Sequence, residues 1–317
     1  MRRHPEVSFG AGSHAAMADQ GTMNPLPGSD YARRVSLILM SLAGLSQGFI
    51  GPIVKLVNFA PLPLVVGRSL IAALALHLIC LLTRRRLDKA DRLNTVICGL
   101  LLAGHFATLF MAYKKTDVNL VLIALFTYPM MTSLLEPVFF GGRPQRRQVV
   151  SAILVTAGVA CLRPAPGGSG DMLAGIGLAL LSALLFSVRN ILSRKLVARS
   201  DGLAIMGWQT TIAALVFAPS CAGLNLAEVP LTVWLGVLAL GIFFTAIPHT
   251  LRILVKRHLT TATVDILAAL QVVGGLLLAW GLVHEALTAN VLLGASLVLT
   301  AVLAEAVSTW RRGAAPE

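Results

Sequence analysis

The sequence predicts an all-α integral membrane protein with ten transmembrane helices arranged as two inverted five-helix repeats, and three observations lead to this prediction. First, 56% of the 317 residues are hydrophobic and only 13% are charged, whereas a soluble domain carries about 25% charged residues. Second, the apolar residues form long blocks, and the basic residues lie mostly between them. Third, the two halves of the chain match each other weakly but in order. A water-facing surface so poor in charge would aggregate, which argues against a soluble protein.

The apolar blocks have the length of about 20 residues that a helix needs to span a bilayer. Several contain Gly or Pro, which membrane helices tolerate. The ten blocks are residues 36–56, 62–83, 94–113, 118–140, 148–163, 172–195, 203–220, 230–251, 261–283 and 288–308.

The net charge of +12 is distributed in a way that predicts membrane topology rather than a nucleic-acid partner. With the N-terminus placed in the cytoplasm, 20 of the 26 Lys and Arg residues fall on the cytoplasmic side. The outer side receives Lys55, Lys114, Lys115 and Arg163, while Arg68 and Arg189 fall within helices. Positive charge marks the cytoplasmic side. We therefore expect both termini to be cytoplasmic and the protein to lie in the cytoplasmic (inner) membrane.

The two ends of the chain are predicted to be tails. Residues 1–35 are polar and Gly-rich, lack the apolar core of a signal peptide, and are expected to be disordered. Met1, Met17 and Met23 are alternative translation starts. Residues 311–317 form the second cytoplasmic tail.

An internal repeat divides the apolar part into residues 36–165 and residues 170–310. The blocks 118–140 and 148–163 align with the last two blocks at an offset of 143 residues, and the first block aligns with the sixth at an offset of 140. Each repeat has five predicted helices. Because five is odd, the second repeat must enter the membrane in the opposite orientation, which is typical of secondary transporters.

Each repeat keeps one of two sequence marks at aligned positions. The first half has Pro129 after Tyr128, but Gly142 follows Gly141 where a Glu would complete a Gly-Glu pair. The second half has Glu285 at the aligned position and lacks the Pro.

With Arg68 in the second block and Gln209 near its repeat mate, this pattern resembles the EamA-type branch of the drug/metabolite transporter superfamily over residues 36–310. The resemblance implies transport of a small organic solute, such as an amino acid or related metabolite. It also implies a cavity lined mainly by helices 1, 3, 4, 6, 8 and 9.

Polar residues near the bilayer centre are costly and tend to face the protein interior, so we expect a set of them to bind the solute. The set consists of Gln47, His105, Tyr128, Thr245 and Gln271. Tyr128 and Gln271 occupy equivalent repeat positions, which predicts that they face each other at one depth. The alternative for each is an interhelical hydrogen bond. His105 could relay a proton, or donate to a neighbouring carbonyl.

Ionisable residues about one turn inside the cytoplasmic boundary suggest a gate. Arg189 is predicted to pair with Asp265 or Glu136, because intramembrane charges usually pair. Release of such a carboxylate could couple gating to proton movement. The alternative is that Arg189 reaches water without a partner.

The functional prediction is a secondary transporter that works by alternating access, with export favoured by the resemblance alone. An uptake permease for a vitamin-like or other metabolite, and a receptor or enzyme without transport, are the alternatives. The sequence shows no catalytic constellation, phosphate-binding loop or metal motif, so we predict neither enzymatic activity nor a cofactor. The expected partners are the solute and the lipid bilayer, and proton coupling and a homodimer stay open.

Overall fold

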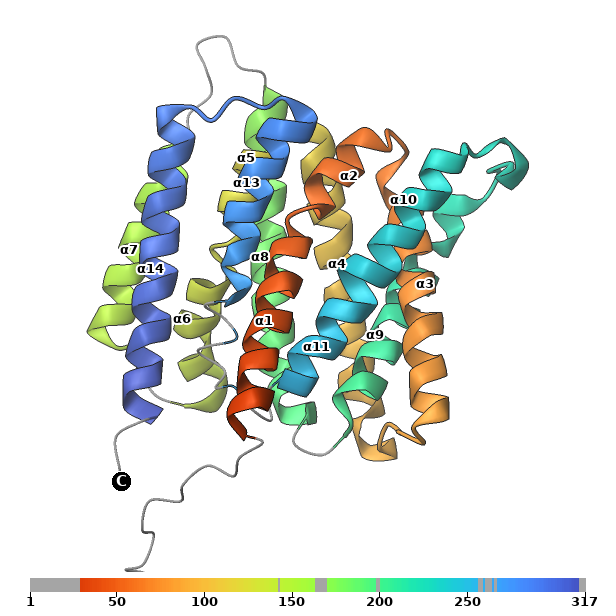
Figure 1. The fold of residues 1–317 in the computed structure, drawn as a ribbon, viewed down its shortest axis with the longest axis horizontal. Helices are drawn as coiled ribbons and strands as arrows, with labels where there is room; N and C mark the ends of the chain where they lie inside the picture. The colour runs from red at the N-terminus through yellow and green to blue at the C-terminus, as the bar shows by residue number, and fades with distance from the viewer. Residues whose placement is uncertain are drawn as a thin grey trace, which may run out of the picture.

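The computed structural model describes residues 29–141, 143–162, 170–197, 200–255, 259, 264 and 267–313. Within these residues, every regular element is a helix. Figure 1 shows the helices as a bundle in which α1 begins and α14 ends at the same, lower end.

The helices follow one another with short connections. They are α1 (Ser29–Gln47), α2 (Ile50–Leu56), α3 (Pro61–Leu82), η1 (Lys89–Asp91), α4 (Arg92–Lys115), α5 (Val118–Leu125), α6 (Tyr128–Phe140), α7 (Arg146–Ala160), α8 (Gly170–Val197), α9 (Gly202–Phe217), η2 (Ala218–Cys221), η3 (Leu226–Glu228), α10 (Leu231–Gly241), the π-helix η4 (Ile242–Ala246), α11 (Ile247–Val255), α13 (Leu270–Val283) and α14 (Ala289–Gly313).

The apolar character of the bundle surface identifies a multi-pass membrane protein. Seven continuous or interrupted helices are long and apolar enough to cross a bilayer, and three further apolar helices in the described residues are shorter. Large apolar side chains on the outside are exposed, as on α3, where Leu74, Leu78 and Leu81 are 62%, 56% and 75% exposed. A soluble monomer rarely exposes such a continuous apolar surface to water. In a bilayer, lipid hydrocarbon chains cover this surface and keep it from water.

The helices extend beyond several predicted blocks. Helix α1 begins at Ser29 rather than at residue 36, and α4 covers Arg92–Lys115 instead of 94–113. Prediction by apolar content ends a helix where polar residues begin, but the hydrogen-bonded turns continue into them. Arg33 and Arg34, at the start of α1, therefore belong to a helix rather than to the predicted tail.

Three of the predicted spans have an interruption that lies four residues before a proline. The α1–α2 break is at Gly48 and Pro52 follows, while the α5–α6 break follows Leu125 and precedes Pro129. Pro248 follows the π-helix η4. Proline has no backbone N–H, so it cannot bond the carbonyl four residues earlier. The sequence thus weakens the helical ladder at three places.

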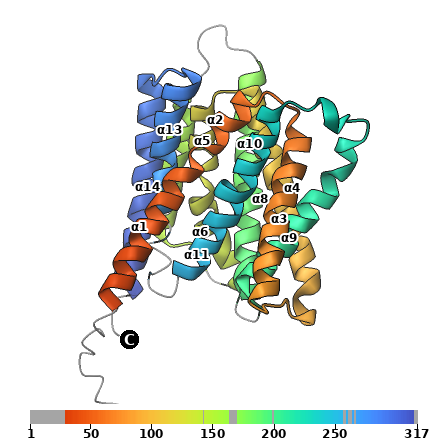
Figure 2. The ribbon, with the colours of Figure 1, turned by 45° about the vertical axis from the view of Figure 1, so that its right-hand side comes forward.

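Helix α1 crosses α13 at very short range, and it also packs against α11 (Figures 1 and 2). Glycines allow this approach, because a Cβ added to Gly48 would lie 2.5 Å from the backbone nitrogen of Gly275. Gly158 and Gly294 similarly bring α7 and α14 together. Small residues at helix contacts are typical of membrane proteins, where close backbone packing replaces the hydrophobic effect.

Candidate functional site

A small cavity lies among the interrupted helices, with a volume of about 40 Å³. This is room for a few water molecules at most. Its lining combines polar, basic, aromatic and aliphatic side chains, which are Gln47, Ile50, Arg68, His105, Phe106, Leu109, Leu125, Tyr128, Phe186, His249, Arg252 and Gln271.

Four of the five residues predicted to bind solute line this one cavity: Gln47, His105, Tyr128 and Gln271. The helix interruptions explain why they meet. Gln47 is the last residue of α1, Tyr128 is the first of α6, and Gln271 is the second of α13. Polar side chains at the ends of half-helices are the arrangement that secondary transporters use for binding.

His105 on α4 is fixed against α8. Its Nδ1 lies 2.7 Å from the Ser182 hydroxyl and 3.1 Å from the Ser182 carbonyl oxygen, and its ring stacks on Phe186 at 4.6 Å between centroids. The side chain is only 6% exposed. The contact with Ser182 matches the alternative in which His105 bonds a neighbouring carbonyl. Its ring also lines the cavity, so the two roles are compatible.

Tyr128 begins α6 and is held by aromatic contacts. Its ring meets Phe186 edge-on at 4.9 Å and Phe126 at 5.4 Å. The Ser187 hydroxyl donates to its backbone carbonyl at 2.8 Å, which ties α6 to α8. These contacts hold the Tyr128 side chain in one orientation in the cavity wall.

Arg68 on α3 is the most completely buried charged residue of the cavity, at 2% exposure. Its Nε donates to the Thr245 hydroxyl at 2.6 Å, and its Nη2 to the Phe244 carbonyl at 3.4 Å. The guanidinium lies over the Phe106 ring, 4.2 Å from its centroid. Phe244 is the residue whose carbonyl Pro248 cannot bond, so the broken helix supplies an acceptor for the arginine.

Thr245, the fifth predicted residue, lies behind this arginine rather than in the cavity lining. Its hydroxyl accepts from Arg68 and donates to the Leu240 carbonyl at 2.6 Å, within the π-helical segment. Thr245 therefore positions Arg68.

Arg189, the predicted gate residue, is 8% exposed and bonds to neutral groups. Its Nε and Nη2 donate to the Gln209 side-chain oxygen at 2.9 and 2.6 Å, and its Nη1 to Asn190 at 3.3 Å. Asp265 lies outside the described residues, and Glu136 is a half-buried residue of α6. The gate stays a prediction. The bond to Gln209 was not predicted, although Gln209 had been noted as lying near the repeat mate of Arg68.

Three further residues line the cavity that the sequence did not predict for the site: Arg68, His249 and Arg252. Arg68 carried the strongest available signal, because an arginine inside an apolar block is the residue a membrane tolerates least. His249 and Arg252 lie at the end of the predicted block 230–251, where polar residues are expected at the membrane boundary rather than in a cavity. The π-helix alters the register there, and α11 continues past them.

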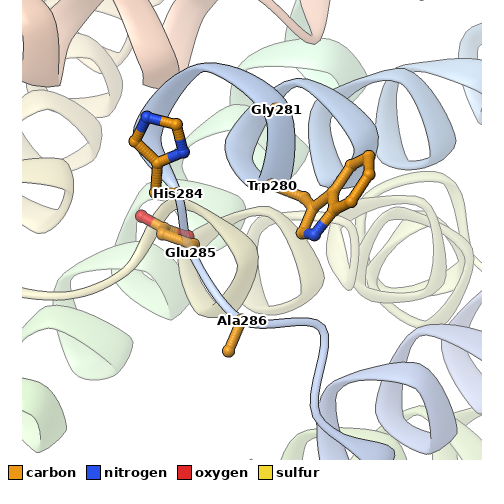
Figure 3. Close-up of a pocket in the computed structure, with 5 residues that line it drawn as sticks. All are labelled: Trp280, Gly281, His284, Glu285 and Ala286. Carbon is orange, nitrogen blue, oxygen red and sulfur yellow. The ribbon is translucent and has the colours of Figure 1, made fainter.

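A second, shallow pocket of about 340 Å³ lies at the C-terminal end of α13, and Figure 3 shows the residues that line it. Its lining includes Trp280, His284 and Glu285. The Glu285 carboxylate accepts from the backbone N–H groups of Val118 and Asn119, at 2.7 and 3.0 Å. Because its oxygens already cap the first turn of α5, we interpret Glu285 as structural. The described residues contain no group of three or more His, Cys, Asp or Glu placed to hold a metal ion.

Comparisons with known proteins identify the family of this chain. The EamA-like transporter family matches twice, over residues 34–163 and 173–304. An uncharacterized transporter, YxxF, of Bacillus subtilis (strain 168) is 24% identical over 250 residues, which are 77% of this chain and 80% of that protein. A solved crystal structure with 21% sequence identity superposes with a TM-score of 0.62, covering 88% of this chain and 98% of its own, and shares the fold. The chain belongs to the EamA-like transporter family.

Proposed function

We propose that this protein is a secondary transporter that moves a small organic solute across the cytoplasmic membrane by alternating access. The observation that carries the proposal is the meeting of interrupted helices around one polar cavity, with Gln47, Tyr128 and Gln271 at the interruptions. Interrupted helices give transporters polar backbone and side-chain groups within the membrane without a lipid-exposed gap.

The architecture that we propose is ten membrane crossings in two inverted five-helix repeats. Seven long apolar helices and three shorter ones support it. The family also matches each half of the chain separately. In this arrangement Tyr128 and Gln271 are equivalent residues of the two repeats, and both line the cavity. Two related halves can then expose one central site to either side in turn.

A cavity of about 40 Å³ is too small for a metabolite, so transport requires it to widen. Contacts join the elements at both ends of the bundle. Lys55 and Glu285 approach within 3.2 Å at the upper end, and Arg85 and Asp201 within 2.7 Å at the lower end. Alternating access requires the contacts at one end to separate while those at the other end remain closed. We propose that the lower end is cytoplasmic, because it carries the basic loops.

Reporter fusions test this orientation. A reporter joined after Arg86 or Arg147 should lie in the cytoplasm, and a reporter joined after Asn225 should lie outside the cell membrane. Alkaline phosphatase activity indicates that the fusion point is external, and green fluorescent protein fluorescence indicates that it is cytoplasmic. External activity after Arg86 would contradict the topology.

Solute flux tests transport itself. The purified full chain is reconstituted into liposomes loaded with one unlabelled amino acid or organic acid, and entry of the labelled compound is followed as counterflow. A carrier should accumulate label transiently and saturably, and empty liposomes should not. Saturable binding without flux would favour a receptor and contradict the proposal. Preset gradients in vesicles of known orientation then separate export, which we favour, from uptake.

Loss of the cavity amides is expected to weaken transport. The side-chain amides of Gln47 and Gln271 make no hydrogen bond to another described residue, so both are available to a solute. Gln47→Ala and Gln271→Ala should each raise KM by about 2- to 10-fold, as for the loss of one hydrogen bond. Thr156→Ala, on the exposed face of α7, is the control. Unchanged kinetics in both variants would mean that the cavity is misassigned.

A further inference from the structure

Apart from Tyr128, the ionisable side chains that line the central cavity are all basic among the described residues. Two arginines, Arg68 and Arg252, and two histidines, His105 and His249, line it. Among the described residues that line the cavity there is no Asp or Glu. A desolvated site with fixed positive charge and no acidic side chain favours a negatively charged ligand.

One nitrogen of Arg68 has no partner. Its Nη1 is buried and makes no hydrogen bond to any described group, while Nε and Nη2 are held by Thr245 and Phe244. Buried charges in proteins are normally paired and hydrogen-bonded, yet no ion pair is found for Arg68 within the described chain. The guanidinium is therefore fixed by three neighbours and retains an unused donor.

The rest of the wall limits the kind of anion. Phe106, Leu109 and Phe186 supply apolar and aromatic surface, and Gln47 and Gln271 supply neutral polar groups. Such a wall suits an apolar body with few hydrogen-bonding groups. It suits a highly charged phosphate ester poorly, because the apolar surface cannot replace the water around several charges.

We propose that the transported solute carries a carboxylate that binds to Arg68, on an aliphatic or aromatic body that packs against Phe106 and Phe186. This inference rests on the proposed transport function, whose binding site it deepens. Arginine offers planar, charged donors that match the oxygens of a carboxylate. Thr245 and the carbonyl of Phe244 act as positioning groups that hold the guanidinium ready for the incoming anion.

A competing explanation is that Arg68 only fastens α3 to the π-helical segment. In that case the charge of a ligand would make no difference to binding. Wild-type protein distinguishes the two without any variant, because acids and amides of equal shape can be compared directly.

The first experiment uses benzoate and hexanoate against benzamide and hexanamide, at pH 7.4, with the full chain in detergent. The unfolding temperature is recorded as each probe is titrated. We expect both carboxylates to raise it in a saturable way, and the amides to need at least about 10-fold higher concentration. Equal effects of acids and amides, or no effect of either acid, would overturn the inference.

The second experiment varies the arginine. Arg68→Gln should lower the affinity for carboxylates by about 10- to 100-fold, as expected for a lost charge-assisted hydrogen bond, and leave the weak amide binding unchanged. Arg68→Lys should be intermediate, because ammonium keeps the charge but not the planar fork. Arg92→Gln, on an exposed helix start, is the matched control and should bind as wild type. Carboxylate binding unaltered in Arg68→Gln would overturn the assignment to Arg68.

Counterflow of the same four probes separates this inference from the proposed function. Carboxylates that bind at Arg68 but do not cross the membrane would contradict transport and leave the binding assignment standing. Flux of neutral solutes without preference for acids would support transport and overturn the carboxylate assignment.

Discussion

Replacing Gly48 by leucine is expected to abolish transport and to destabilise the protein. The reason is the crossing of α1 and α13, where a Cβ on Gly48 would lie 2.5 Å from the backbone nitrogen and 3.0 Å from the Cα of Gly275. Both of these atoms belong to backbone, so no side chain can rotate away and the helices must separate. Overpacking of this kind costs about 1–3 kcal/mol and sometimes more. Gln47 and Gln271, which flank the crossing, would move apart.

The measurements are the unfolding temperature in detergent and counterflow in liposomes. Gly177→Leu is the matched control, because a Cβ at Gly177 on α8 would have no atom within 4 Å. It should leave both quantities unchanged. Gly48→Ala, the smallest addition, should reduce transport but retain part of the stability. Normal transport by Gly48→Leu would show that the contact between α1 and α13 does not shape the cavity.

The helical, membrane-embedded fold was predictable because burial in lipid leaves a simple trace in the sequence. A chain that faces hydrocarbon must be apolar over about 20 residues, and the predicted blocks overlap apolar helices in the described residues, although several blocks are interrupted. The interruptions were predictable only in part. Pro129 and Pro248 indicate that the helical ladder is weakened near Leu125 and Phe244. No local pattern displays the π-helical form of η4 or the bonds that Thr245 makes there with Leu240 and Arg68.

The candidate site was predictable to the extent that a polar residue in an apolar helix must face the interior. Four residues predicted on this ground share one cavity: Gln47, His105, Tyr128 and Gln271. Partner choice was not predictable in this way. The hydrogen bonds that Arg189 donates to Gln209 were not predicted, since the spatial neighbours of a side chain follow from helix packing. The pairing of Arg189 with Asp265 or Glu136 stays a prediction.

Removal of the Glu285 carboxylate is expected to loosen the upper end of the bundle. This side chain accepts hydrogen bonds from the N–H groups of Val118 and Asn119 and lies 3.2 Å from the Lys55 ammonium. It therefore joins α13, α5 and α2. The first N–H groups of a helix have no partner within the helix, and the helix dipole favours a negative charge there. Glu285→Ala would leave two buried donors unsatisfied and should cost about 3 kcal/mol.

Glu285→Gln retains the shape of the side chain and separates the effect of charge from that of volume. It should cost less than Glu285→Ala, since one amide oxygen can still accept, whereas the attraction to Lys55 is lost. Asp171→Asn is the control, because Asp171 pairs with Lys115 at 2.7 Å where both side chains are exposed. Exposed ion pairs contribute little, so this variant should unfold at the wild-type temperature. Equal unfolding temperatures for wild type and Glu285→Ala would contradict the capping role.

Glu285→Gln should also shift the transport cycle if the upper end opens to the outside. Contacts that exist only when the upper end is closed raise the population of the closed state. Weakening them favours opening. Val121, on α5 below the capped turn and fully buried, reports this opening when replaced by cysteine, with Cys161 and Cys221 replaced by serine. An impermeant maleimide should label Val121→Cys faster when Glu285→Gln is also present, and Asp171→Asn should not change the rate. Slower or unaltered labelling would show that the Glu285 contacts do not restrain an outward opening. If these contacts hold the closed state, weakening them must raise the population of the open state and therefore the labelling rate.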